Sequence, residues 1–319
     1  MLSNLVLPTY YIKIKNVVIC GMGGSGLGGD VVKYLMPRLQ RPLTVVHDYD
    51  IPNFVDNETL LILISYSGNT EETIECYKQG IKKNARIFVV STGGVLIDMA
   101  KSDGLPFFQY EYSCPPRYAV GYSFTAILGI LNKLAVINLS QNQIKESILL
   151  LSAWVKKLSI DVPASRNSAK QLAQKLVDRI PVVIGQAESA GVNHIWKTHF
   201  NETAKTASYS EDLPDLNHYA VTGSKFPKKL VDRLFFIILQ SKYSNPRLKL
   251  QENLFIQSLD KAGLDYEAVF MHPTNDIISE IYLNILFGLY TAYYLAILNK
   301  VNPSETPLQE FIKNTLSEK

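Results

Sequence analysis

The chain has 319 residues, 47% of them hydrophobic and 19% charged, which is an ordinary globular composition for about two domains. Lys and Arg number 32 against 29 Asp and Glu, and this even balance argues against nucleic acid or an anionic membrane surface as a partner. Three widely separated cysteines, Cys20, Cys76 and Cys114, predict neither a disulfide framework nor a zinc site. With no secretory pattern in residues 1–11, we expect a cytoplasmic protein.

The first half alternates short apolar runs with helical patterns. Strands are predicted at 16–20, 43–47, 60–65, 86–90 and 106–109, and helices at 27–35, 71–79, 95–101 and 124–136. Runs that are apolar throughout are typical of a parallel sheet covered by helices on both faces.

A second α/β pattern follows a polar, mostly helical stretch at 138–163. Strands are predicted at 181–184, 234–239 and 267–271, and helices at 192–207, 277–298 and 307–316. The predicted fold class is therefore α/β, with two doubly wound parallel sheets in tandem, in domains 1–150 and 151–319. Residues 281–298 carry no charge but include Asn, Gly, Thr and four Tyr, so we expect a helix buried in protein and no membrane span.

A glycine-rich loop, Gly21-Met22-Gly23-Gly24-Ser25-Gly26, follows the first strand and opens a helix. Glycines at such a point let the backbone approach an anion at the positive end of the helix. The pattern suits a phosphate and a dinucleotide equally, and Asp48 or Asp50 would then be the ribose-binding acid. A tight strand–helix turn without a ligand is the third interpretation.

The loop after the third strand favours a phosphate monoester. Ser65, Ser67 and Thr70 offer three hydroxyls over six residues, spaced for a compact tetrahedral group. Helix capping by Asn69 or Thr70 is the structural alternative, although it explains one hydroxyl of the three. No lysine lies in this loop, which argues against nucleotide hydrolysis.

The second half holds residue types that serve general acid–base chemistry, which are a carboxylate, an imidazole and cations. Glu202 lies on the helix predicted at 192–207, and His218 follows in a Pro/Asp/Asn-rich loop. Each also has a bland interpretation, Glu202 as a solvated partner of Lys205 and His218 as a turn residue. His194 and His199 are five apart and share no helix face, so we predict no metal site.

Two resemblances give these residues roles. The stretch SYSGNTEET at 65–73, together with the glycine loop, resembles the sugar isomerase (SIS) domain. The stretches KTHFNETAK at 197–205 and DLPDLNHY at 212–219 resemble the bifunctional phosphoglucose/phosphomannose isomerase family, and this resemblance runs through most of the chain. The resemblance implies two SIS-type, flavodoxin-like subdomains and a metal-independent isomerase without a cofactor.

The same resemblance implies a role for individual residues. Glu202 matches the base that moves a proton between C1 and C2 through a cis-enediol. His218 matches the residue that opens the sugar ring, contributed in the family by the partner subunit of a homodimer. Arg117 matches the enediol-stabilising arginine, and Lys300 the lysine near the ring oxygen. The positions that match substrate-binding residues, chiefly for the phosphate, are Gly24, Ser25, Ser65, Ser67 and Thr70.

Two departures and one specificity residue complete these expectations. The glycine loop begins after only 20 residues, where family members have a longer lead, and Tyr219 stands where the family more often has Asn. Tolerance of both C2 epimers is associated in the family with a small hydroxyl residue, for which Thr291 is the candidate, with a buried core threonine as the alternative.

Two other functions are carried forward. A non-catalytic SIS module that senses sugar phosphates would need the loops around Ser25 and Ser67 but not Glu202 or His218. A nicotinamide-dependent dehydrogenase would use the glycine loop and Asp48, and would leave the loop at 65–73 unexplained.

Overall fold

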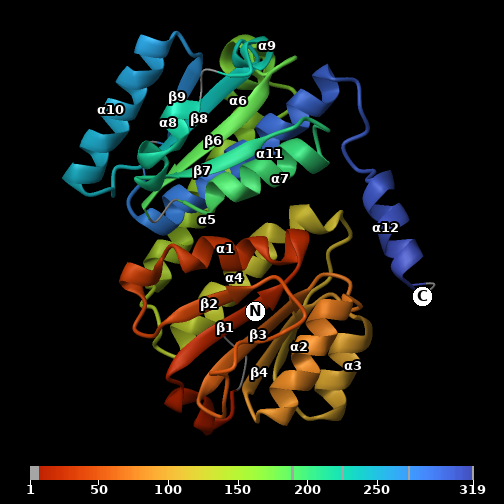
Figure 1. The fold of residues 1–319 in the computed structure, drawn as a ribbon. Coiled ribbons are helices and arrows are strands. Elements are labelled where there is room, and N and C mark those ends of the chain that lie inside the picture. The colour runs from red at the N-terminus through yellow and green to blue at the C-terminus, as the bar shows by residue number, and fades with distance from the viewer. Residues whose placement is uncertain (1–6, 188–189, 224–225, 272–273, 318–319) are drawn as a thin grey trace. The chain divides into compact units, whose positions relative to one another are not determined.

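The computed structural model describes residues 7–187, 190–223, 226–271 and 274–317 (Figure 1). The chain forms two compact units, Met1–Lys145 with Glu188–Gly191, and Glu146–Ala187 with Val192–Lys319. Each is a parallel α/β sheet unit and is described by itself.

The sheet of the first unit has five parallel strands in the order β2-β1-β3-β4-β5. This is the flavodoxin-like order, whose ligand crevice lies at the carboxyl ends of the two strands where the winding reverses, here β1 and β3. All seven residues of β3 are buried, which explains its uninterrupted apolar sequence. The strands are β1 (Asn16–Gly21), β2 (Leu43–Val46), β3 (Thr59–Ser65), β4 (Arg86–Ser91) and β5 (Phe107–Gln109).

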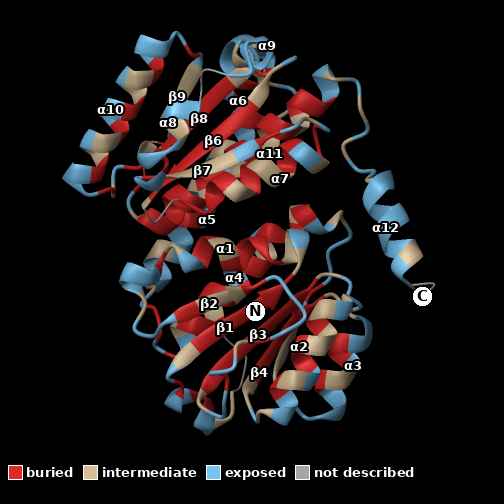
Figure 2. Ribbon diagram, in the orientation of Figure 1, coloured by how far each residue is buried: buried red, intermediate tan, exposed pale blue. Residues whose placement is uncertain are grey.

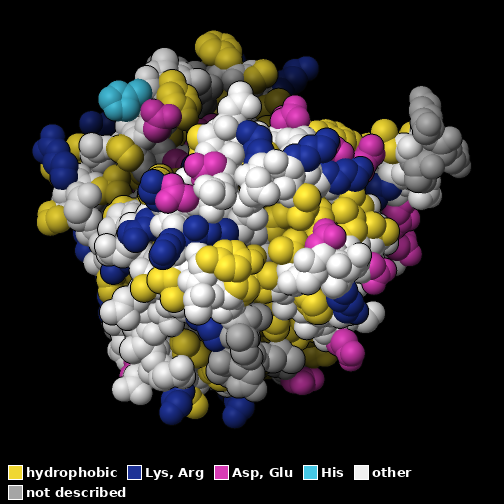
Figure 3. Space-filling view, turned by 90° about the horizontal axis from the view of Figure 1, so that it is seen from below, with side chains coloured by type: hydrophobic (Ala, Val, Ile, Leu, Met, Phe, Trp, Pro, Cys, Tyr) yellow, Lys and Arg dark blue, Asp and Glu magenta, His cyan; other side chains and the backbone are white. Residues whose placement is uncertain are grey.

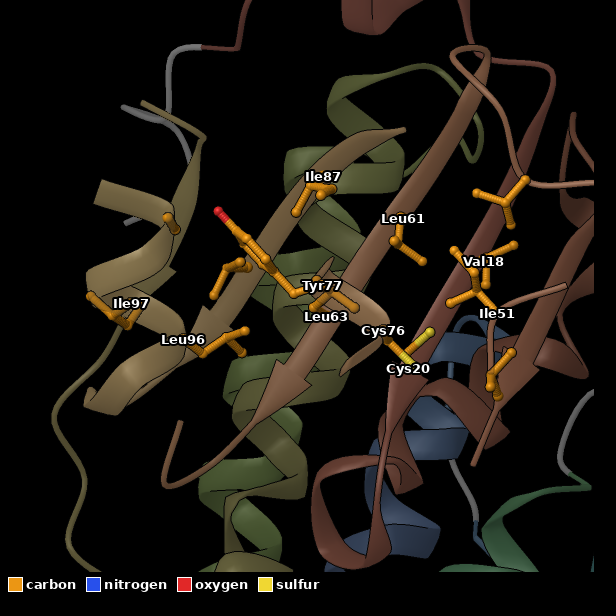
Figure 4. Packing of buried hydrophobic residues seen from close by; sticks show 14 residues of the cluster. Val18, Cys20, Ile51, Leu61, Leu63, Cys76, Tyr77, Ile87, Leu96 and Ile97 are labelled. Atoms are coloured by element: carbon orange, nitrogen blue, oxygen red, sulfur yellow. The ribbon is translucent and has the colours of Figure 1, made fainter. Parts of the chain in front are cut away.

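Helices of the first unit supply the other half of its core. Figure 4 shows Cys76 and Tyr77 of α2 and Leu96 and Ile97 of α3 packing with the strand residues Val18, Leu61, Leu63 and Ile87. In Figure 2 the central strands β1, β3 and β4 are almost wholly buried and these helices are exposed on their outer faces, as amphipathic covering helices should be. The helices are α1 (Leu27–Lys33), α2 (Glu71–Lys82), α3 (Gly94–Ser102) and α4 (Val120–Lys133).

The second unit repeats the arrangement with four parallel strands in the order β7-β6-β8-β9. A core of Val182, Ile184, Phe236 and Ile238 from the two central strands packs against Phe255 of α10. The strands are β6 (Ile180–Gln186), β7 (Tyr209–Leu213), β8 (Leu234–Gln240) and β9 (Tyr266–Phe270). The helices are α5 (Gln141–Leu158), α6 (Ser168–Lys175), α7 (Val192–Glu202), α8 (Ala220–Gly223), α9 (Lys228–Val231), α10 (Pro246–Ala262), α11 (Ile277–Leu298) and α12 (Pro307–Ser317).

Helix α11 is long and apolar enough to cross a membrane by length and composition, but 61% of its most apolar window is buried inside the protein. It packs against α6 and α7, and the Trp196 indole donates to the Asn284 carbonyl oxygen at 2.9 Å. A cap begins it, since the Asp276 carboxylate accepts from the Ser279 amide. These contacts are those of a core helix.

Several elements differ from the sequence predictions, and helices α6, α8 and α9 were not predicted. The helix predicted at 192–207 ends at Glu202, because the Thr203 and Ala204 amides both turn back to the His199 carbonyl and Lys205 adopts a left-handed φ of 55°. Strand β7 was not predicted, because its sequence, YSEDL, is polar and suits an edge strand. Helix α10 was not predicted either, although Asn245 caps its start and Gly263 ends it with a left-handed φ of 66°.

The balanced composition is also visible on the surface. On the face shown in Figure 3, basic and acidic side chains lie interspersed among polar and apolar ones. Any anion site must therefore be made by local geometry.

Candidate functional site

The glycine loop lies between β1 and α1, and close packing explains two of its glycines, Gly24 and Gly26. A Cβ on Gly24 would lie 2.6 Å from the Arg117 backbone nitrogen, so the loop and the segment carrying Arg117 are in direct contact. A Cβ on Gly26 would lie 2.5 Å from the Gly21 carbonyl oxygen. These two positions therefore have no room for a side chain, which suits a loop that presents its backbone to an anion.

Two of the three hydroxyls of the second loop, those of Ser65 and Thr70, lie against each other. Ser65 Oγ and Thr70 Oγ1 are 2.8 Å apart, Ser65 Oγ accepts from the Gly68 amide at 3.0 Å, and Ser67 Oγ accepts from the Asn69 amide at 3.2 Å. Thr70 occupies the N-cap of α2 but its side chain makes no capping bond. Helix capping therefore does not account for the Ser65 and Thr70 hydroxyls, which form a small polar cradle at the end of β3, whereas Ser67 is exposed.

A direct bond joins the two loops. Ser25 Oγ accepts from the Tyr66 amide at 2.9 Å, which places Ser25 beside the Ser65–Thr70 loop at the carboxyl ends of β1 and β3. The structure thus brings together Gly24, Ser25, Ser65, Thr70 and the Arg117 segment within the first unit. This is the crevice at which open α/β sheets bind ligands.

Arg117 is 2% exposed and lies on a short 3-10 helix, Pro116–Ala119. Its guanidinium carbon is 5.2 Å from the centroid of the Tyr118 ring. From the sequence alone this arginine looks like a loop residue, whereas in the structure it is among the largest fully buried side chains.

His47 is a polar residue that the sequence analysis did not select. Its Nδ1 lies 2.6 Å from the Gly21 carbonyl oxygen and its Nε2 lies 2.8 Å from Asp30 Oδ1. Hydrogen bonding to the Asp30 carboxylate raises the pKa of His47, and burial opposes that rise. A protonated His47 would add positive charge at the start of the glycine loop. In the sequence, its place at the end of the strand predicted at 43–47 is the signal that could have pointed to it.

The two acids considered for a nucleotide ribose serve local structure. Asp48 Oδ1 accepts from the Tyr49 amide at 2.7 Å, and Asp50 Oδ1 accepts from Gln79 Nε2 at 3.1 Å. Both bonds stabilise the chain between β2 and β3, so these carboxylates already have structural roles there.

In the second unit, Glu202 is the last residue of α7 and is partly buried. Lys205 Nζ donates to the Glu202 main-chain carbonyl, so the lysine holds the backbone at the helix end. Lys300 follows the last residues of α11 and is exposed, with a left-handed φ of 57°. The Val301 amide donates to the Ala296 carbonyl and the Lys300 amide to the Ile297 carbonyl, each at 3.1 Å. This is the Schellman pattern of a helix C-terminus, in which Gly usually stands where this chain has Lys300.

The ends of these two helices are joined by Asn299. Its Nδ2 donates to the Ala204 carbonyl oxygen and to Thr206 Oγ1, both at 3.0 Å. The residue before Lys300 is therefore hydrogen-bonded to the turn that follows Glu202.

His218 ends a short 3-10 helix, Asp215–His218, and is exposed. Its neighbour Tyr219 donates its hydroxyl to Glu211 Oε2 of β7 at 2.8 Å. This hydrogen bond to a carboxylate raises the pKa of Tyr219 to about 12. The tyrosine that departs from the family pattern is thus held against the neighbouring strand.

Thr291 is fully buried in α11, and its hydroxyl donates to the Phe287 carbonyl one turn earlier at 2.8 Å. These contacts are those of the alternative foreseen for it, a core threonine. Among the described residues, no three or more His, Cys, Asp or Glu side chains group in a way that could hold a metal ion.

Comparison with known proteins covers almost the whole chain. Residues 10–102 match the SIS domain, and residues 165–316 match the bacterial phospho-glucose isomerase C-terminal SIS domain. The chain is 31% identical over 307 residues to a bifunctional phosphoglucose/phosphomannose isomerase of Caldicellulosiruptor bescii, covering 96% of this chain and 90% of that protein. It is 30% identical over 309 residues to the protein of the same name from Thermoplasma volcanium, covering 96% and 92%.

A solved structure agrees on the fold. Glucosamine-6-phosphate deaminase of Thermotoga maritima superposes with a TM-score of 0.70 over 92% of this chain and 88% of that one, at 17% sequence identity. Both units are thus SIS domains, arranged in tandem along the chain. The near-complete coverage at 31% identity, with the phosphate-type cradle at the expected strand ends, shows that the chain belongs to the bifunctional phosphoglucose/phosphomannose isomerase family.

Proposed function

We propose that the protein interconverts fructose 6-phosphate with both glucose 6-phosphate and mannose 6-phosphate, through a cis-enediol and without a metal ion. The observation that carries the proposal is the identity to bifunctional isomerases over 96% of the chain. The hydroxyl cradle at the end of β3 supports it, because it suits a phosphate monoester.

The proposed reaction needs one base. Glu202 takes the proton from C2 of the open-chain aldose, the C–H electrons form the C1–C2 double bond, and the carbonyl oxygen gains a proton to give the enediol. Returning the proton to C1 while the C2 hydroxyl loses its proton yields fructose 6-phosphate. A carboxylate at the end of a helix with a tethered backbone suits this task, because its position is well defined.

The other residues have charge and proton roles in the proposal. Arg117 stabilises the negative charge that develops on the enediol oxygens, and its burial strengthens that interaction. Lys300 and His218 assist ring opening. Gly24, Ser25, Ser65, Ser67 and Thr70 bind the substrate, chiefly its phosphate.

One base can serve both aldoses, because glucose 6-phosphate and mannose 6-phosphate differ only at C2 and give the same planar enediol. The assignment of Thr291 to this tolerance remains a proposal, and since its hydroxyl is buried and bonded, any influence must pass through the packing of α11.

We also propose a cytoplasmic homodimer, with domains 1–150 and 151–319, in which His218 acts in the partner's active site. The exposure of His218 is compatible with this role. Helix α12 further exposes apolar side chains with helical spacing, at Leu308, Phe311, Ile312 and Leu316.

Mixing subunits tests whether His218 acts in the partner's active site. Dimers of E202Q and dimers of H218A are each inactive, whereas their hybrids contain one complete site, so an equal mixture restores about a quarter of wild-type activity. No recovery on mixing would place His218 in its own subunit.

The test of the function itself is an assay with EDTA and fructose 6-phosphate, in which both aldose phosphates are quantified separately. Both are expected to form, and in D2O deuterium should appear at C2 of the aldose phosphates, because the protonated base can exchange its proton with solvent. Glu202→Gln should lose at least about 10³-fold in kcat while still binding substrate. Glu146→Gln, an exposed change on α5, is the matched control and should retain full activity.

The outcomes separate the alternatives. Binding of fructose 6-phosphate without either product would overturn the enzyme and favour the sugar-phosphate sensor. One aldose alone would overturn the dual specificity. Turnover that EDTA abolishes and added metal restores would overturn metal independence.

A further inference from the structure

Tyr66 is hydrogen-bonded to several loops of the first unit. Its amide donates to Ser25 Oγ at 2.9 Å, and its carbonyl oxygen accepts from the Thr92 amide and hydroxyl at 3.1 and 2.6 Å. The main chain of this one residue thus joins the glycine loop, its own hydroxyl-rich loop and the end of β4.

The side chain of Tyr66 reaches in a different direction. Its hydroxyl donates to the Tyr112 carbonyl oxygen at 2.5 Å and accepts from the Cys114 amide at 2.9 Å. Both bonds are to the main chain, so the phenol fixes the path of residues 112–114 whatever their side chains are. A partly buried phenol that both donates and accepts has used its full ordinary hydrogen-bonding capacity.

The segment that Tyr66 holds leads directly to Arg117. Cys114 is followed by Pro115 and Pro116, whose rings restrict the backbone, and then by Arg117. Displacement of Cys114 is therefore transmitted along a stiff connection. The glycine loop holds the far side of the same segment, because a Cβ added to Gly24 would lie only 2.6 Å from the Arg117 nitrogen.

Aromatic packing keeps the phenol in place. The Tyr66 ring meets that of Tyr110 edge-on at 6.5 Å, and Tyr110 stacks on Tyr122 at 4.7 Å. Tyr110 is buried, so the ring of Tyr66 packs against a side chain of the core.

We propose that Tyr66 is a positioning residue for Arg117, which it aligns with the phosphate-binding loops by holding residues 112–114 through its hydroxyl and Ser25 through its amide. The inference rests on the proposed function, because it takes Arg117 to act on the enediol. It adds a residue that touches no reacting atom yet determines where the arginine lies.

Tyr66→Phe tests this by removing a single oxygen and leaving the ring in place. Because a displacement of about 1 Å can cost about 10²-fold, kcat should fall by about 10- to 100-fold, while the affinity for substrate, held by the serine and threonine hydroxyls, changes less than about threefold. Tyr122→Phe is the matched control. It lies in the same aromatic cluster, and its contacts in the described structure are those of its ring, so kcat should stay within about twofold of wild type.

A double-mutant cycle identifies the route of the effect. If Tyr66 acts through Arg117, Y66F combined with R117K should be no slower than R117K alone, whereas independent effects would multiply. Multiplied losses, or a Y66F enzyme with unchanged kcat beside an impaired R117K, would overturn the inference while leaving the isomerase intact.

A measurement without turnover keeps the inference testable if the function is wrong. Hydrogen exchange of the Cys114 and Arg117 amides should accelerate at least about tenfold in Y66F and remain unchanged in Y122F. Unchanged exchange in Y66F would show that the phenol does not hold this segment, and the inference would fail even for an active enzyme.

Discussion

Asn299 Nδ2 lies 3.0 Å from the Ala204 carbonyl oxygen, and this bond ties the end of the helix that precedes Lys300 to the turn that follows Glu202. A second bond from the same nitrogen to Thr206 Oγ1, also 3.0 Å, anchors that turn where it leads to β7. Two side chains that are 98 positions apart in sequence (300 − 202) are thereby carried on adjoining backbone.

Asn299→Ala removes both bonds. Losing them should lower the free energy of unfolding by about 1–3 kcal/mol and kcat by about tenfold, because Glu202 and Lys300 lose their common anchor. Asn299→Asp should be worse than Ala, since a carboxylate has no hydrogen to donate and faces a carbonyl oxygen. Asn302→Ala is the control, because the side chain of Asn302 bonds locally, with the nearby Glu305 and Ser304. Denaturant melts and steady-state rates decide the matter, and an N299A enzyme with full kcat would refute the anchor.

Gly24→Ala should disable the protein at the junction of the glycine loop and the Arg117 segment. The added Cβ would meet backbone atoms of Arg117 and Pro116 at 2.6 to 2.8 Å, and backbone cannot rotate away as a side chain can. We expect kcat/KM to fall by about 10- to 100-fold.

The exposed Gly121, a few residues beyond Arg117, provides the comparison for Gly24. A Cβ there meets nothing within 4 Å, and the residue lies in α4, so Gly121→Ala should preserve activity and raise stability by about 0.5–1 kcal/mol. Equal effects of the two substitutions on kcat/KM would show that the close approach at Gly24 has no functional weight.

His47 should titrate above the ordinary histidine pKa of about 6.5. Both ring nitrogens face acceptors, the Gly21 carbonyl and the Asp30 carboxylate, and only the imidazolium can donate to both. The Lys33 charge opposes this shift. Because the folded-state pKa is raised, the stabilisation is fully present below about pH 6.5 and is lost as the pH rises through the folded pKa.

The measurement for His47 is an NMR titration of the histidine ring protons, with H47Q identifying the resonance. Asp30→Asn should return the midpoint toward the ordinary histidine value, because the carboxylate is the largest cause of the shift. A wild-type midpoint at or below about 6.5 would rule out a protonated His47 that donates to both Gly21 and Asp30.

Glu280 also has a raised pKa, but the cause is burial and not a hydrogen bond. It is fully buried in α11, and burial raises its pKa to about 7, against partial relief from Ser241 and Lys242. The folded protein therefore binds more protons than the unfolded chain between about pH 4.5 and 7, so this residue makes stability fall as the pH rises across that window, by up to about 3 kcal/mol. Glu280→Gln should remove this slope, whereas the exposed Glu310→Gln should leave it. Parallel stability curves for wild type and E280Q would contradict the buried, titrating carboxyl.

Much of the architecture follows from local patterns in the sequence. The apolar run at 60–65 predicts a central strand because a strand covered on both faces has no polar side, and β3 is buried at every residue. The helix predicted at 277–298 has the bounds of α11, because apolar residues and an Asp cap mark it locally. Helix α10 and strand β7 were missed because their mixed sequences owe their structure to packing against β8 and pairing with β6.

The proposed chemistry rests on the amino-acid order: three hydroxyls after one strand, glycines after another, and the motifs in which Glu202, His218, Arg117 and Lys300 resemble a known family. The side chains that hold the proposed site residues in place can be identified only in the folded chain. The ring of His47, the phenol of Tyr66 and the amide of Asn299 are ordinary polar side chains in sequence, and each becomes informative only through a partner 26 to 95 residues away. The physical reason is that hydrogen-bond direction and burial depend on which backbone atoms the fold brings within about 3 Å, and no local pattern encodes that distance.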